Sequence, residues 1–228
     1  MKRRITLISL LVFTMLLAAC GGDSTEEPKP EEEQSFEVTD DEKVDDDEVV
    51  AHINGTDVTG DEYNLAYLQT KVQLFQLGED VDDQDSVRER ALDALVEREL
   101  LKQDAEEKGV EISEEEIDSE IEEIKQEDEE QFKSFLDEYH FTESSFKMQL
   151  AFEMLYDKYV AEEFPDIDVS EKEVEEFYQE IKDENEDIGE LEDVEDMLKT
   201  GLKQEKEGEK MQERIEELKE KAEVDMKI

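Results

Sequence analysis

The chain has few of the residues that build disulfides, metal sites or cationic surfaces. Its 228 residues include no Trp, one Cys, two His and three Pro. A single Cys excludes an intrachain disulfide framework and a Cys-rich metal site, and two His leave little for zinc or His-based catalysis. The chain has 25 Lys and Arg residues against 73 Asp and Glu residues, which gives a formal net charge of −48. A polyanion of this strength excludes binding to nucleic-acid phosphates.

The first twenty residues predict export and lipid attachment. A basic start and an apolar run over residues 5–19 indicate a signal peptide at residues 1–19, because the run is too short to span a bilayer comfortably. The run ends in Leu17-Ala18-Ala19-Cys20, which resembles the lipobox of bacterial lipoproteins. This resemblance implies cleavage before Cys20, a diacylglycerol anchor with palmitate-type chains on its sulfur, and a place on the extracytoplasmic face of the cell membrane. The lipobox and the lack of disulfides favour a Gram-positive host, with a Gram-negative periplasm as the alternative. An ordinary signal peptide that contains a Cys, or an uncleaved anchor, is the alternative.

The acidic stretch that follows, residues 20–48, predicts a disordered tether. Residues 21–48 contain 14 acidic residues, two Lys and few large apolar side chains. Such a stretch buries too little apolar surface to offset the entropy cost of ordering. We therefore expect it to hold a folded domain, residues 49–228, away from the membrane. The acidic clusters at 45–47 and 80–85 lack EF-hand spacing, so no metal site is predicted.

From residue 49 the pattern predicts a mainly helical domain with a small β element. Residues 49–53 alternate like a strand, Asn54-Gly55 is a tight-turn signal, and residues 57–58 form a short returning arm. Beyond the turn, apolar residues recur at helical spacing, and several of these segments start with a capping box. The helical spacing covers residues 63–75, 87–105, 117–124, 132–139, 146–159, 174–181 and 190–222.

The last residues, 224–228, alternate like a strand again. No other segment offers a strand partner, so we expect this strand to pair with residues 49–53 and join the two ends of the domain. The N-terminal hairpin and the C-terminal strand together would form the β element.

The order of these segments resembles the start of SurA-like and PrsA-like foldases. Single motifs in it are mostly caps and turns, and their order over this length carries the resemblance. The matching segments are residues 50–63, 91–101, 105–117, 132–136, 142–146 and 169–178. The resemblance implies a multi-helix peptide-binding chaperone module of the SurA and trigger-factor type. It also implies that the partners are unfolded or nascent exported polypeptides.

The chain departs from those foldases after Tyr178. In the foldases a parvulin-type prolyl isomerase domain follows this point, whereas here only residues 179–189 precede the last expected helix. The nearest His, His140, is expected at a helix end, where it would interact with the helix dipole. The resemblance therefore implies the chaperone module without its enzyme, with no catalytic residues and no cofactor.

Residues 132–164 are the richest in aromatic and Met side chains, which a chaperone uses as adaptable apolar surface. In the fifth expected helix, Met148, Phe152 and Tyr156 fall on a different face from the main apolar stripe. We predict that these three side chains, together with Phe135, line a client groove. The alternative is that both faces are core and that the second packs on the C-terminal helix.

The net charge itself predicts strong self-repulsion, which salt screens. We expect a halophilic or alkaliphilic host. The leading hypothesis is a non-catalytic, membrane-anchored chaperone for exported polypeptides. The alternatives are a polyanionic envelope lipoprotein with a structural or cation-binding role and, less favoured, a peptidyl-prolyl isomerase. Nothing in the sequence sets the oligomeric state.

Overall fold

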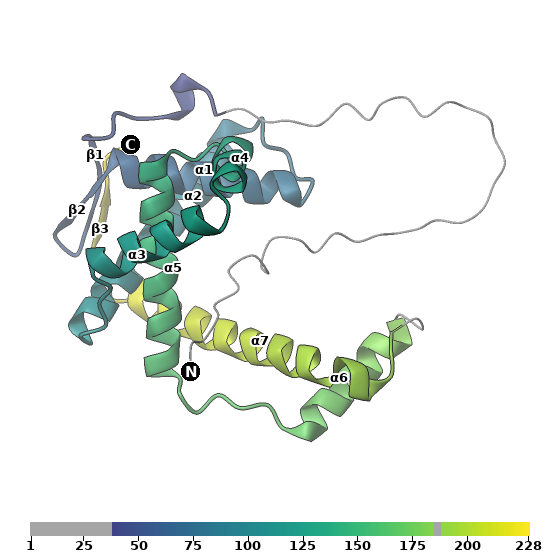
Figure 1. The fold of residues 1–228 in the computed structure, drawn as a ribbon. Coiled ribbons are helices and arrows are strands. Elements are labelled where there is room, and N and C mark those ends of the chain that lie inside the picture. The colour runs from purple at the N-terminus through teal and green to yellow at the C-terminus, as the bar shows by residue number, and fades with distance from the viewer. Residues whose placement is uncertain (1–37, 185–187) are drawn as a thin grey trace. The chain divides into compact units, whose positions relative to one another are not determined.

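The computed structural model describes residues 38–184 and 188–228 (Figure 1). The predicted signal peptide and Cys20 lie outside the described residues. Within this part of the chain the fold is mainly α with one small sheet, as predicted. The elements are the 3-10 helix η2 (Asp40–Glu42), β1 (Val49–Ile53), β2 (Thr56–Thr59), α1 (Gly60–Gln76), α2 (Gln84–Glu107), α3 (Glu114–Glu127), α4 (Glu129–Glu138), α5 (Glu143–Glu163), α6 (Glu171–Glu184), α7 (Leu191–Lys219) and β3 (Val224–Met226).

The sheet has the strand order β2-β1-β3, and both pairings are antiparallel (Figure 1). Asn54 and Gly55 have φ values of 52° and 86°, the left-handed conformation that a two-residue hairpin turn requires. In the second pairing Val224 lies opposite Ile53 and Met226 lies opposite Ala51. The predicted pairing of the two ends of the domain is confirmed.

Four helices begin with a capping box, three of them at a box and one at an N-cap that the sequence predicted. At α3, the Ser113 backbone N–H donates to Glu116 Oε2 at 2.9 Å, and the Glu116 N–H donates to Ser113 Oγ at 3.3 Å. Such reciprocal bonds satisfy two N–H groups that have no partner inside the helix. The other boxes pair Thr59 with Glu62, Thr142 with Ser145 and Ser170 with Glu173.

The described residues form three apolar clusters. The first joins the sheet to α1 and α2, the second joins α2, α5 and α7, and the third joins α6 to the N-terminal half of α7. Helix α7 is continuous through Gly201 and Gly208, although glycine within a helix is unfavourable. No helix in the described part of the chain is both long enough and apolar enough to cross a membrane.

The predicted tether is wrong for residues 38–48, which pack on the domain. Val38 and Val44 contact the first cluster, and the Glu42 side chain is buried beside Lys71 and Tyr67 of α1. Burial opposes the charge of Glu42, but its bonds to Lys71, Thr39 and Tyr67 outweigh this and lower its pKa to about 2. Composition predicted disorder because a single buried ion pair leaves no mark on the average charge and hydropathy of a segment.

Candidate functional site

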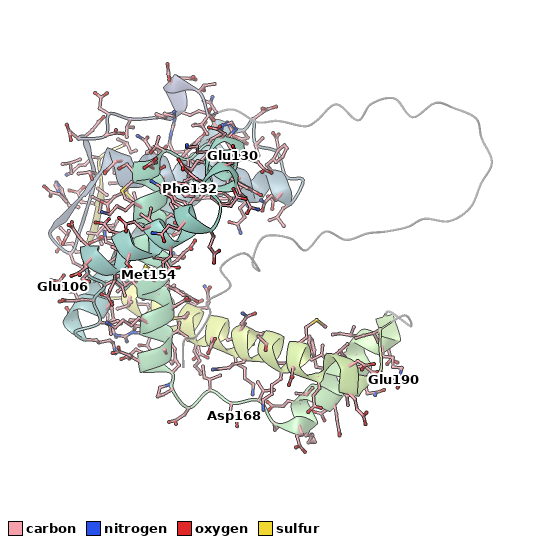
Figure 2. All side chains as sticks on the ribbon, viewed as in Figure 1. Glu106, Glu130, Phe132, Met154, Asp168 and Glu190 are labelled. Atoms are coloured by element: carbon pink, nitrogen blue, oxygen red, sulfur yellow. The ribbon has the colours of Figure 1, made fainter. Side chains whose placement is uncertain are left out.

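A hollow of about 260 Å³ lies where α1, α2, α3 and α5 meet. Its floor is apolar, and Leu65 of α1 and Ile117 of α3 are buried there. The charged residues Glu62, Arg98 and Lys102 stand at its rim. Figure 2 shows how many side chains of the described residues end in oxygen, as expected of so acidic a chain. The lining residues are Glu62, Leu65, Arg98, Lys102, Ile112, Ile117, Met148, Ala151, Phe152 and Leu155.

Two of the four predicted client-binding residues meet in this hollow. Met148 and Phe152 lie one turn apart on α5, so their side chains share a face of the helix. Both are half-buried. Met is flexible and polarisable and Phe presents a broad apolar ring, so this wall adapts to apolar side chains of different shape.

Arg98 of α2 closes the wall opposite Phe152. Its guanidinium carbon lies 4.2 Å from the centre of the Phe152 ring, a cation–π contact. Its N–H groups donate to the Met148 carbonyl and to Gln149 Oε1, both at 2.9 Å. Burial lowers the pKa of Arg98 to about 10, and the charges of Glu62 and Glu153 offset this in part. Arg98 therefore stays charged at neutral pH while its guanidinium lies over the aromatic ring.

Lys102, one turn beyond Arg98, is held by two carboxylates. Its Nζ lies 2.7 Å from Glu62 Oε1 and 2.9 Å from Glu99 Oε2. Burial opposes the charge of Lys102, but the bonds to Glu62 and Glu99 outweigh it and raise its pKa. These links join α1 to α2 and fix the charged rim of the hollow. The site thus combines an adaptable apolar wall with a rim of positioned charges.

The structure does not bring the other two predicted residues to the hollow. Phe135 stacks among the aromatic rings of Tyr139, Phe141 and Phe146, with centroid distances of 4.8, 6.1 and 5.9 Å. It is part of the α4–α5 corner, where Phe132 is labelled in Figure 2. Phe135 therefore does not line the hollow with Met148 and Phe152.

Tyr156 does not line the hollow. It packs on the cluster that contains Met211 of α7, and burial and the charges of Asp157 and Glu207 raise its pKa. Phe152 and Leu155 border the same cluster while they also line the hollow. The alternative interpretation, in which this second face of α5 packs on the C-terminal helix, therefore describes Tyr156.

The sequence interpretation missed the residues that other helices supply to the hollow. Arg98 and Lys102 are four residues apart on α2, where two cations on one face stand out in so acidic a chain. That spacing was the sequence signal that could have identified them. Leu65, Ile112 and Ile117 carry no such signal, because their pattern is that of ordinary core positions in an amphipathic helix or just before its N-terminus.

The described residues show no group of three or more His, Cys, Asp or Glu side chains placed to hold a metal ion. The polar groups at the hollow include Lys102, which is paired with the carboxylates of Glu62 and Glu99.

Comparison with known proteins places the chain in a family. Residues 5–160, more than half of the chain, match the family model of the SurA-like N-terminal domain, and every residue that lines the hollow lies within this range. The foldase protein PrsA of Caldanaerobacter subterraneus subsp. tengcongensis is 29% identical over 147 residues, which are 60% of this chain and 44% of that protein. The chain therefore spans less than half the length of this relative. The chain belongs to the family of proteins with a SurA-like N-terminal domain.

Proposed function

We propose that the protein is a non-catalytic chaperone that binds unfolded exported polypeptides through the hollow between α1, α2, α3 and α5. The observation that carries the proposal is the adaptable wall of Met148 and Phe152 facing Arg98 within the region that matches the SurA-like family. An apolar client side chain would enter between Met148 and Phe152. Client backbone carbonyls would accept hydrogen bonds from the charged rim.

The size of the hollow suits weak and reversible binding. Burying one Leu- or Phe-sized side chain contributes about 1.5–3 kcal/mol, which alone corresponds to a Kd weaker than about 1 mM. A client that presents several apolar side chains in turn gains affinity by repeated engagement. Release then needs no energy source, which suits a chaperone that works outside the cytoplasm.

The absence of isomerase activity and the membrane anchor are further parts of this proposal. Helix α6 ends at Glu184 and α7 begins at Leu191, so the connection between them is short where the foldases insert their isomerase domain. Lipid attachment at Cys20 would place the protein on the extracytoplasmic face of the membrane. The Cys20→Ser variant should then leave the membrane fraction, and a variant that stays there would contradict lipid anchoring.

Aggregation of an unfolded client, followed by light scattering in molar NaCl, tests the chaperone proposal. We expect the protein to suppress scattering at near-equal stoichiometry, and an equally acidic inert protein to have no effect. The Met148→Ser/Phe152→Ser variant should lose suppression because the apolar wall is gone. Since Phe152 also packs on the core, a second variant, Met148→Glu, places a charge in the hollow and leaves the ring in place.

The matched control replaces two exposed apolar side chains outside the hollow, in the variant Leu77→Ser/Met197→Ser. Leu77 and Met197 are 65% and 63% exposed, so their loss should change neither folding nor suppression. Equal suppression by the wild type, both hollow variants and the control would show that the hollow is not the client site. No suppression by the wild type would remove the chaperone proposal, and prolyl isomerisation of a proline peptide by the purified chain would contradict its non-catalytic part.

A further inference from the structure

The outer edge of β3 carries backbone groups that no described strand uses. The sheet order is β2-β1-β3, so within residues 38–184 and 188–228 the far side of β3 faces no other strand. The Lys227 N–H donates to the Val50 carbonyl, and the Glu223 carbonyl accepts from the Asn54 N–H. The odd-numbered residues of this segment therefore direct their backbone groups toward β1. In an antiparallel ladder the intervening residues then direct their N–H and C=O groups away from β1. Val224 and Met226 therefore present these groups to the open edge.

The side chains of Val224 and Met226 lie on the helix-covered face of the sheet but are only partly covered. Ala51 and Ile53 of β1 are fully buried under the helices, and their partners Met226 and Val224 share that face of the sheet. Yet Met226 is 36% and Val224 is 41% exposed. The helical cover is complete over β1 and incomplete over β3.

A hollow of about 800 Å³ occupies the space left beside β3. Val224 and Met226 form one side, and Leu92 and Val96 of α2 form the other. Ligand pockets commonly measure about 300–1,000 Å³, so the space accommodates several side chains. A strand added to the edge of β3 would direct every second side chain into it, because side chains alternate between the faces of a sheet.

The charges around this surface select the occupant. Glu89 and Asp93 line the hollow, and its two cations are already paired, Arg90 with Glu79 at 2.9 Å and Lys219 with Asp93 and Glu97. The net charge of −48 opposes the approach of a second copy of the chain and attracts a cationic segment.

We infer that the open edge of β3, together with the hollow between β3 and α2, binds an extended polypeptide segment in which apolar residues alternate with Lys or Arg. The segment pairs its backbone with Val224 and Met226 and buries its apolar side chains over Leu92 and Val96. It directs its cations to the opposite face, where Asp225 pairs with Lys227 and where a segment cation would compete for the same carboxylate. About five residues, roughly 17 Å of extended chain, span this edge. The inference rests on the proposed function, since the segment belongs to an unfolded client, but the surface is separate from the hollow that Met148 and Phe152 line.

The test measures binding of a fluorescein-labelled heptapeptide of alternating Lys and Val to the full chain by fluorescence anisotropy. The Met226→Pro variant removes one N–H from the open edge, and the alternation of the ladder gives that N–H no bond to β1. Met226→Leu keeps both the N–H and the apolar contact. We expect Met226→Pro to weaken binding roughly tenfold, Met226→Leu to bind as the wild type does, and both to keep the wild-type melting temperature within a few degrees. A peptide with Glu in place of Lys should not bind.

Equal binding to the proline variant and the wild type, or equal binding of the Glu peptide, would overturn the inference. Sedimentation that shows a dimer lost only in Met226→Pro would assign the edge to a second copy and overturn it as well. The Met148→Ser/Phe152→Ser variant distinguishes the two proposals. If it loses suppression of aggregation while Met226→Pro binds the peptide normally, the inference fails and the proposed function stands. If the wild type suppresses no aggregation and Met226→Pro still loses the peptide, the proposed function fails and the edge site stands.

Discussion

Replacing Arg214 with Leu removes one side of a buried ion pair that joins α2 to α7. Arg214 Nε lies 3.0 Å from Asp104 Oδ2, and Nη2 lies 2.6 Å from Asp104 Oδ1, so the pair is bidentate. The Tyr159 hydroxyl of α5 donates to the same carboxylate. The Asp104 side chain is 4% exposed and that of Arg214 is 26% exposed. The substitution therefore leaves a buried carboxylate with Tyr159 as its remaining strong donor.

Breaking a buried pair from one side costs about 3–5 kcal/mol, because the remaining charge stays out of water. Arg214 is partly exposed and Tyr159 keeps one bond, so we expect the lower end, a loss of about 3 kcal/mol in the free energy of unfolding. For a domain of 150–250 residues this corresponds to a melting temperature lower by about 6–12 °C.

The pH dependence has a definite sign. Burial raises the pKa of Asp104, but its bonds to Arg214 and Tyr159 outweigh this and hold the pKa below its usual value. A carboxyl with a lowered pKa stabilises the fold above its unfolded pKa, about 3.9, and loses that contribution as the pH falls through its folded pKa. The difference between wild type and Arg214→Leu should therefore be largest near pH 7 and shrink below about pH 4.

Urea unfolding followed by circular dichroism, in molar NaCl at pH 7 and pH 3, measures this difference. The matched control is Arg90→Leu, since Arg90 forms an exposed pair with Glu79 at 2.9 Å. Exposed pairs contribute about 0–1 kcal/mol, so the control should stay close to the wild type. A loss for Arg214→Leu no larger than that of the control, or a difference that grows toward pH 3, would refute the reasoning.

Three further predictions concern the termini of the domain and its charge. The Glu42→Gln variant should have a lower free energy of unfolding than the wild type at neutral pH. Because the pKa of Glu42 is about 2 in the folded state, this difference should shrink when urea unfolding is repeated from pH 5 down toward pH 2. An equal difference at pH 5 and pH 2 would contradict this prediction. Truncation after Ala222 removes the whole β1–β3 pairing together with the backbone bonds that join Glu223 to Asn54 and Lys227 to Val50, and we expect a loss of at least about 2 kcal/mol by calorimetry, whereas no change would show that β3 adds nothing to stability. The melting temperature should rise steeply from low salt to molar NaCl, because screening weakens the self-repulsion of a chain with net charge −48, and a flat response would contradict this.

Local patterns predicted the elements, and contacts between distant residues decided the site. The capping box at Ser113 and the turn at Asn54-Gly55 involve neighbours in sequence, so their geometry follows from residue type. Met148 and Phe152 line the same hollow, and their shared face on one helix follows from spacing alone. Phe135 and Tyr156 were grouped with them because aromatic content does not show which neighbour a ring contacts. One packs into the α4–α5 corner and the other on the cluster with Met211.

The sequence by itself determined the helical class, the starts of the helices, the hairpin and the strand that returns from the C-terminal end, because each depends on periodicity or on bonds within a few residues. Only the tertiary structure decided that Arg98 contacts the Phe152 ring, that the Glu42–Lys71 ion pair holds residues 38–48 against α1, and that the side chains of β3 are left partly exposed by the helices. These features join residues far apart in the chain, and their energy depends on burial and distance, which composition and spacing do not specify.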